Sequence, residues 1–293
     1  MSDPVRNQIE VVICAFQRSG HHAIMQWLLP RLNPPVCLLH DVVPYSDPFF
    51  SYVDGRQFME QHRDMLMPLD DIEALRRTSR NCLMIDYQDT PLDDLTNPNI
   101  IPNRTTNLGH SDKRFHVLII RDPFNLAASR LTRTRYVQEQ VANGNPDWRL
   151  RLRINTRGTA DMYPGKRFFH LWLEYAKEYL GQTNRLAACR GSTTIKIAYN
   201  HWFTDPSSRA KICADMGVVN DDRNLERVSA GGKGSSFDGL EFDGRAADME
   251  VLGRWRKLLG DEEFRGMFKG QVEVYELSKA IFGEIPGTAE LIG

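Results

Sequence analysis

The sequence predicts an α/β protein whose central parallel β-sheet is flanked by helices. Short apolar runs rich in β-branched residues alternate with amphipathic segments, and this alternation is typical of a doubly wound sheet. Residues 115–120, FHVLII, give the clearest strand, and residues 11–29 run from a buried strand through a polar turn into a helix. Because the sequence shows neither an internal repeat nor a linker, we expect residues 1–293 to form one domain.

The expected strands are short apolar runs, and several of them end on polar residues. They lie at residues 11–16, 36–39, 81–87, 115–120 and 193–199. Ligands of open parallel sheets bind beyond the carboxyl ends of the strands. The residues at or just past those ends are therefore candidates for a site: Phe16, His40, Asp89, Arg121 and Tyr199.

The expected helices combine apolar periodicity with start and stop signals. Asp122-Pro123 and Asp205-Pro206 each offer an N-cap followed by a first-turn proline, while Pro30 and Gly217 each end a helix. These patterns predict helices near residues 23–29, 70–80, 124–136, 168–180, 206–216, 246–259 and 261–282. Segments without a clear hydrophobic periodicity are expected to be irregular. Residues 44–63 are expected to form a long segment on the substrate side, and residues 96–114, 143–164 and 229–239 are expected to be loops.

Composition places the chain among ordinary globular proteins, with 41% hydrophobic and 26% charged residues. The 37 basic and 38 acidic side chains leave a net charge of −1, so no overall positive field attracts nucleic acid. Any anion site must therefore be a local cluster of positive charge. No run reaches membrane-spanning length, and the N-terminus lacks an apolar signal core. The five scattered cysteines form no C-x-x-C pair, which favours a reducing compartment. We expect a cytoplasmic protein without a membrane span, a nucleic-acid partner or a zinc site.

The polar turn between the first strand and the first helix is a candidate phosphate site. Such a turn aims backbone N–H groups and the positive end of the helix dipole at one point. Arg18 adds a full charge, and Ser19, His21 and His22 add donors around Gly20. The nucleotide-triphosphatase loop G-x-x-x-x-G-K-[ST] is absent, so we expect the ligand to bind without a metal. The alternative is a plain strand-to-helix connection that binds nothing.

Separated motifs resemble those of sulfotransferases that use 3′-phosphoadenosine 5′-phosphosulfate (PAPS). Residues 16–22 are similar to the P-K-S-G-T-T-W loop that holds the 5′-phosphosulfate, with Arg18 in place of lysine and His21-His22 in place of the threonines. Ala23 stands where the family has a tryptophan that stacks on adenine. Arg121 and Ser129 fit the pattern R-[ND]-P-x₅-S of the 3′-phosphate site.

Two later segments extend the resemblance along most of the chain. Residues 199–206 resemble Y-E-D-x₃-D-P, whose tyrosine contacts adenine, and residues 232–238 resemble the loop R-K-G-x-x-G-D that closes over the 3′-phosphate, without its arginine. The GHH form of the first loop, together with GGKGSSFDG at 231–239, looks closer to bacterial members than to animal cytosolic ones. The resemblance implies a P-loop-NTPase-like three-layer fold and donor contacts from these residues: Gln17, Arg18, Ser19, Gly20, His21, His22, Ala23, Arg121, Ser129, Tyr199, Gly232, Lys233, Gly234 and Ser235.

The implied reaction moves a sulfuryl group from PAPS to a hydroxyl or amine of a small-molecule or glycan acceptor, leaving 3′-phosphoadenosine 5′-phosphate (PAP). In-line transfer proceeds through a loose transition state, so the protein mainly positions the reactants and neutralises the charge that develops on the leaving phosphate. This role is expected of Arg18 and of His21 or His22. The base that takes the acceptor's proton is either His40 or a carboxylate of the 86–89 strand end, such as Asp89. The other possibilities are a P-loop-type kinase of a small molecule and a non-catalytic nucleotide-binding protein.

Overall fold

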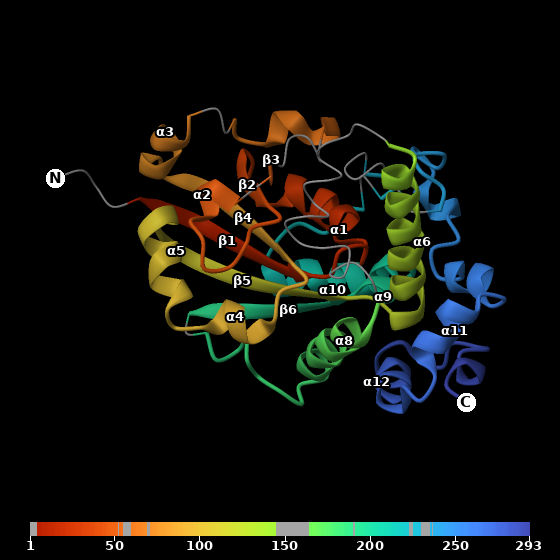
Figure 1. The fold of residues 1–293 in the computed structure, drawn as a ribbon. Helices are drawn as coiled ribbons and strands as arrows, with labels where there is room; N and C mark the ends of the chain where they lie inside the picture. The colour runs from red at the N-terminus through yellow and green to blue at the C-terminus, as the bar shows by residue number, and fades with distance from the viewer. Residues whose placement is uncertain are drawn as a thin grey trace.

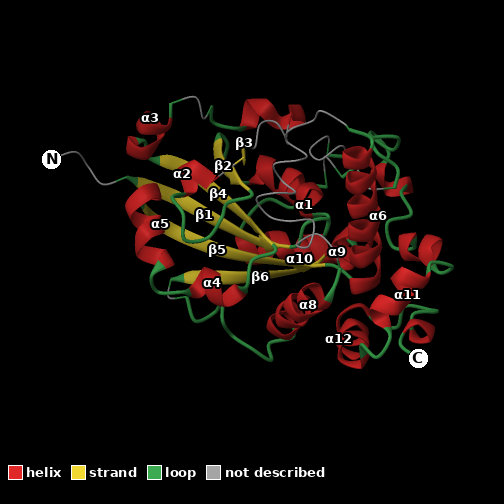
Figure 2. Ribbon diagram, in the orientation of Figure 1, coloured by secondary structure: helices red, strands yellow, loops and turns green. Residues whose placement is uncertain are grey.

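A six-stranded sheet lies between two layers of helices in the computed structural model (Figures 1 and 2). The strand order is β3-β2-β4-β1-β5-β6, and every pairing is parallel except that of β3 with β2. The predicted α/β class with a central parallel sheet is therefore confirmed. The structure describes residues 5–51, 53–54, 60–68, 71–144, 164–189, 191–222, 225–229, 235 and 237–293.

The strands follow the predicted apolar runs and extend two of them. Their bounds are β1 Arg6–Ala15, β2 Val36–His40, β3 Val53–Asp54, β4 Arg80–Gln88, β5 His110–Ile120 and β6 Ser192–Ala198. The early parts of β1 and β5 are polar, which hid them from a search for apolar runs. Glu10 of β1 is only 2% exposed, because Arg114 at 2.8 Å and Arg104 at 3.4 Å surround its carboxylate. Such compensation allows a charge inside a sheet.

Successive β1 residues point to opposite faces of the sheet and enter separate apolar cores. Val12 and Cys14 belong to a core that includes residues of α4 and α8, whereas Val11 and Ile13 belong to one that includes residues of α1 and α10. Figure 1 shows α4 and α8 on one side of the sheet and α1 and α10 on the other. The helices are α1 His21–Leu28, α2 Pro48–Ser51, α3 Ile72–Arg77, α4 Leu92–Thr96, α5 Ile100–Leu108, α6 Pro123–Ala142, α8 Lys166–Tyr179, α9 Tyr199–Thr204, α10 Pro206–Met216, α11 Glu262–Phe268 and α12 Val272–Phe282.

The predicted helix starts at aspartate-proline pairs are confirmed by their hydrogen bonds. The Asp122 carboxylate accepts from the Asn125 N–H at the start of α6, and the Asp205 carboxylate accepts from Ser207 and Ser208 at the start of α10. Gly217 ends α10 as predicted, and its φ of 69° lies in the left-handed region. No helix of the described residues is both long enough and apolar enough to cross a membrane.

Three expectations of the sequence analysis are wrong. Residues 261–282, expected as one helix, form two, α11 and α12, which are separated at residues 269–271. Residues 96–114, expected as a loop, contain α5 and the first half of β5. Residues 246–259, expected as one helix, form two 3₁₀ turns, Ala246–Asp248 and Arg254–Leu258. The helix is interrupted because the carbonyls of Val251 and Leu252 accept hydrogen bonds from the side chains of Arg121 and Asn125. Tertiary hydrogen bonds thus replace a helical ladder at this point.

Candidate functional site

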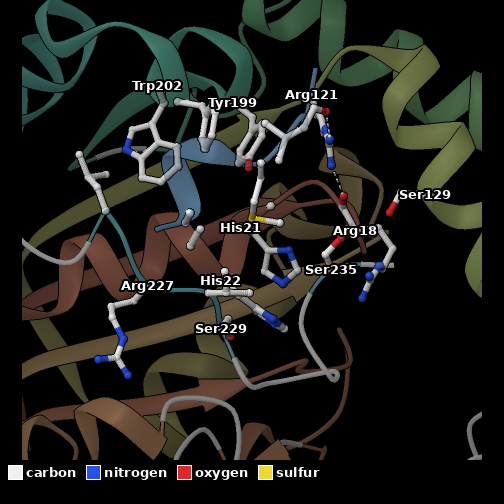
Figure 3. Close-up of a pocket in the computed structure, with 18 of the residues that line it drawn as sticks. Arg18, His21, His22, Arg121, Ser129, Tyr199, Trp202, Arg227, Ser229 and Ser235 are labelled. Carbon is white, nitrogen blue, oxygen red and sulfur yellow. Dashed lines mark hydrogen bonds between the residues drawn. The ribbon is translucent and has the colours of Figure 1, made fainter. Parts of the chain in front are cut away.

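A cavity of about 290 Å³ opens beside the loop that follows β1 (Figure 3). Its wall combines that loop with the ends of β2 and β4, with α6 and α9, and with the C-terminal segment 246–254. Most of the predicted site residues meet here: Gln17, Arg18, Gly20, His21, His22, Ala23, His40, Arg121, Ser129, Tyr199 and Ser235. Gly232, Lys233 and Gly234 lie outside the described residues.

The start of α1 lies at this cavity, and within the loop the N–H groups of Ser19 and Ala23 donate to the carbonyls of Phe16 and Gly20. No described side chain caps the helix, and its first turn holds no acidic residue. The first N–H groups of an uncapped helix and its dipole favour an anion. Arg18 and Gly20 both take left-handed backbone angles, with φ of 71° and 87°. Ser19 is fully buried, and its Oγ lies 3.5 Å from Nδ1 of His21, so its side chain supports the loop from within.

Gly20 is required by the ring of Tyr199 as well as by its backbone angle. A Cβ atom at this position would lie 2.2 Å from Cε2 of Tyr199, far inside van der Waals contact. The guanidinium of Arg121 also packs on this tyrosine, 4.9 Å from the centre of the ring. The ring of Tyr199 therefore contacts both the first loop and Arg121 at the end of β5, and fixes their relative position.

Six arginines line the cavity, and no carboxylate does so among the described lining residues. They are Arg18, Arg121, Arg133, Arg209, Arg227 and Arg254. The guanidinium of Arg121 donates to the carbonyls of Arg18 and Val251, at 3.1 and 2.6 Å, and neither acceptor neutralises its charge. The Nε atoms of Arg121 and Arg254 are buried without a hydrogen-bond partner among the described residues. Asp222, Asp243 and Asp238 behind the lining pair with Arg209, Arg227 and Arg254. The positive charge that suits an anionic ligand therefore comes chiefly from Arg18, Arg121 and Arg133.

Electrostatics at Arg18 indicate the same ligand class. Burial, followed by repulsion from Arg133, Arg121 and Arg254, lowers the pKa of Arg18 to about 9. The guanidinium is still charged at neutral pH, but burial and the neighbouring arginines both make its charged form less favourable. A bound dianion would relieve both effects, so the cluster favours anion binding.

Arg254 reaches the cavity from outside any motif of the sequence. It lies in the 3₁₀ turn Arg254–Leu258, is only 4% exposed, and donates to Oδ2 of Asp238 at 2.5 Å. Asp238 ends the glycine-rich segment at 232–238. Burial, followed by Arg121, lowers the pKa of Arg254. The sequence pattern predicted an amphipathic helix for this arginine and gave no signal for the cavity.

The histidines of the first loop meet His40 and a buried carboxylate. Nδ1 of His40 lies 2.6 Å from Oδ2 of Asp86, and its Nε2 lies 3.3 Å from Nε2 of His22. Gln88 donates to the same Asp86 oxygen at 2.7 Å. Burial alone would raise the pKa of Asp86, but His21, His40 and Gln88 lower it below its ordinary value. An ionised Asp86 fixes the His40 proton on Nδ1 and leaves the lone pair on Nε2.

His21 is neutral in this arrangement, because burial lowers its pKa to about 4 despite the nearby Asp86. Asp89, the other candidate base, lies elsewhere. Nη1 of Arg130 contacts Oδ1 of Asp89 at 2.6 Å, and Asp89 is not part of the cavity lining. Burial raises the pKa of Asp89, and Arg130 opposes that rise. Asp89 therefore belongs to an ion pair beside the site.

Sequence reasoning missed a second group of lining residues. Arg133 follows Ser129 by one helical turn, so the i, i+4 spacing on α6 offered a signal that it shares the face of Ser129. Trp202 and Phe203 belong to the motif at 199–206, and Gln88 to the 86–89 strand end, but none was singled out. The others come from segments without a motif: Arg209, Leu225, Arg227, Val228, Ser229, Ala246, Ala247, Met249, Val251 and Arg254. They are brought together only by the tertiary fold.

No family model and no curated protein sequence matches the chain. Among solved structures it is similar to the sulfotransferase domain from the Synechococcus PCC 7002 olefin synthase, with a TM-score of 0.43 and 14% identity over 98% of both chains. It is also similar to the sulfotransferase domain from the curacin biosynthetic pathway, with a TM-score of 0.38 and 13% identity. That match covers 97% of this chain and 100% of the other.

Proposed function

We propose that residues 1–293 act as one PAPS-dependent sulfotransferase domain, a cytoplasmic and metal-independent transferase. The observation that carries the proposal is the cavity at the first loop, which is lined by six arginines and by no carboxylate among the described residues. PAPS carries its charges at two separate ends, a 5′-phosphosulfate and a 3′-phosphate. The arginines come from several segments around the cavity, including the loop after β1, the β5–α6 junction and segment 246–254, which suits a ligand with more than one anionic group.

The first loop is proposed to hold the 5′-phosphosulfate. Its backbone N–H groups, the start of α1 and Arg18 supply positive charge, and Gln17, His22 and Ala23 complete the wall. The 3′-phosphate is assigned to Arg121 and Ser129, with Tyr199 beside the adenosine. Gly232, Lys233, Gly234 and Ser235 are assigned to the closure over this end. Arg254, tied to Asp238, would supply the arginine that the segment 232–238 lacks.

Bound PAPS supplies the sulfuryl group, and the chain's own residues position it and move the proton. His40 takes the proton of the acceptor hydroxyl or amine on Nε2, while its other proton stays on Nδ1, facing Oδ2 of the ionised Asp86. The acceptor oxygen or nitrogen bonds to sulfur as the bond from sulfur to the bridging phosphate oxygen breaks. Arg18 and the loop N–H groups meet the charge that develops on the departing phosphate. His22, or the neutral His21, lies beside that position.

His40 is preferred to Asp89 as the base because of where the two groups lie. His40 lines the cavity and has an oriented Nε2, whereas the Asp89 carboxylate is engaged by Arg130. Asp86 acts as a positioning residue, because it contacts His40 but does not itself line the cavity. The acceptor is assigned only by class, as a small molecule or glycan with a hydroxyl or amine.

Isothermal titration calorimetry tests the donor assignment with two ligands that differ only in the 3′-phosphate, PAP and AMP. Loss of a charged hydrogen bond, about 1.5–3 kcal/mol, predicts that Arg121→Ala and Ser129→Ala each weaken PAP binding by roughly tenfold or more. AMP binding should change much less. Arg254→Ala should behave like Arg121→Ala, and Arg256→Ala, which removes an exposed arginine two residues away, is the matched control.

Two outcomes would count against the proposal. Equal losses for PAP and AMP would show that Arg121 and Ser129 do not contact a 3′-phosphate. Tighter binding of ATP with magnesium than of PAP would favour the kinase alternative. Transfer of label from radioactive PAPS to a panel of hydroxyl and amine acceptors then separates an enzyme from a non-catalytic nucleotide-binding protein.

A further inference from the structure

Three histidines meet at the wall of the cavity with the spacing of metal ligands. His21 and His22 begin α1, His40 ends β2, and one ring nitrogen of each lies within 4.8 Å of the others. The closest pair, Nε2 of His22 and Nε2 of His40, is 3.3 Å apart. Two nitrogens bound to a tetrahedral zinc ion at about 2.0–2.1 Å lie about 3.3–3.4 Å from each other. This pair already has that separation.

The residues behind the cluster are arranged as the support of a metal site. A ligand histidine usually donates its second ring N–H to a carboxylate, which fixes the ring and its tautomer. Asp86 stands in this relation to His40, with Oδ2 at 2.6 Å from Nδ1. Nε2 of His21 is buried without a hydrogen-bond partner among the described residues, 3.8 Å from the same oxygen. The cluster thus offers oriented nitrogens and a fully buried carboxylate behind them.

We propose that His21, His22 and His40 bind a Zn²⁺ ion, with Asp86 holding His40 in the ligand orientation. Imidazole nitrogen suits zinc, whereas magnesium and calcium prefer oxygen ligands. Three protein ligands leave the fourth position of a tetrahedral ion open, and all three histidines line the cavity.

Bound zinc would stop sulfuryl transfer, a consequence that rests on the proposed function. The ion uses the Nε2 lone pair of His40, which the proposed reaction needs for the acceptor's proton. It adds positive charge beside the first loop and leaves Arg121, Ser129 and Arg254 in place. Zinc should therefore lower kcat at least tenfold at saturating PAPS without weakening PAP binding, and EDTA should restore the rate.

Metal binding is measured on the full chain without reference to activity. Zinc calorimetry and the visible absorption of Co²⁺ should give one site, with the intense bands of tetrahedral cobalt. His22→Ala should lower zinc affinity by at least about a hundredfold. Asp86→Asn should lower it by about 10–100-fold, as loss of a supporting carboxylate does. His110→Ala, which removes an exposed histidine at the start of β5, should leave the affinity unchanged.

His22 is only half-buried, so its replacement should leave the fold intact, which circular dichroism checks. Equal zinc affinity in the wild type and His22→Ala, or the lack of a saturable site below millimolar zinc, would overturn the metal site. Zinc binding with unchanged kcat would overturn the inhibition. Specific zinc binding to a chain that transfers no sulfuryl group would support the site and count against the proposed function alone.

Discussion

Replacing Gly20 by alanine should destabilise the protein through two separable effects. Its φ of 87° lies in the left-handed region. Such a backbone angle costs an alanine about 1–2 kcal/mol. The added Cβ would also lie 2.2 Å from the Tyr199 ring, which is 5% exposed and packed against Arg121 and Trp202. Overpacking of this kind adds about 1–3 kcal/mol, so the expected total loss is about 2–5 kcal/mol.

A double-mutant cycle separates the two effects. In the Tyr199→Val background the ring atoms that meet the Cβ are gone, so Gly20→Ala should cost only the backbone strain of about 1–2 kcal/mol. Gly217→Ala is the matched control, because Gly217 has a φ of 69° and the nearest atom to its Cβ position is the flexible Lys113 Nζ at 3.7 Å. It should lose only the backbone strain of about 1–2 kcal/mol.

Urea unfolding followed by circular dichroism gives the free energy of each variant, with the m value as a check on two-state behaviour. The cycle should show a coupling of at least about 1 kcal/mol between positions 20 and 199, above the error of additivity. If Gly20→Ala lowered the free energy of unfolding equally in both backgrounds, the Tyr199 ring would not restrict the residue at position 20. The relative position of the loop and β5 would then need another cause.

Two further predictions concern charge. Arg18→Ala should lower kcat by about a hundredfold or more while changing the Kd for PAP far less, since the loss falls on the transition state, and Arg18→Lys should recover much of the rate; loss of melting temperature with unchanged kcat would make Arg18 a structural residue. Burial lowers the pKa of His21 from 6.5 to about 4 and that of His116 from 6.5 to about 3. Below about pH 6.5 these histidines are therefore protonated in the unfolded chain but still neutral in the folded chain. The free energy of unfolding should therefore fall as pH drops below about 6.5, by roughly 3 kcal/mol for His21 alone, and His116→Gln should flatten the urea-derived pH profile; an identical profile in the variant would contradict this.

Much of the sheet could be predicted because its strands are buried on both faces and read as continuous apolar runs. The first loop was visible for a related reason, since its strand, turn and helix are adjacent in sequence. Segment 96–114 was missed because its helix α5 is rich in asparagine and threonine, which disfavour helices locally. Packing on the sheet decides its structure, with Leu108 only 1% exposed.

The base and the arginine cluster show where sequence reasoning stops. Whether His40 or the 86–89 strand end supplies the base could not be read from two separate strand ends. The pairing of β2 with β4 sets Leu39 beside Ile85, and this register lets Asp86 reach His40. Arg254 is 133 positions beyond Arg121 in the chain and lies in no motif, so only the tertiary structure brings the two to one cavity.

The bonds that fasten segment 251–255 to the β5–α6 junction have a consequence for how the protein matures. Arg121 reaches the Val251 carbonyl, and the Asn125 side chain bonds both the Leu252 carbonyl and the Trp255 N–H. One wall of the cavity is thus supplied by chain that leaves the ribosome long after the first loop, and domains fold as their residues emerge. A nascent or prematurely ended chain has the turn proposed to bind phosphate without the far wall of the cavity. Such fragments should therefore bind the proposed nucleotide more weakly than the complete chain does.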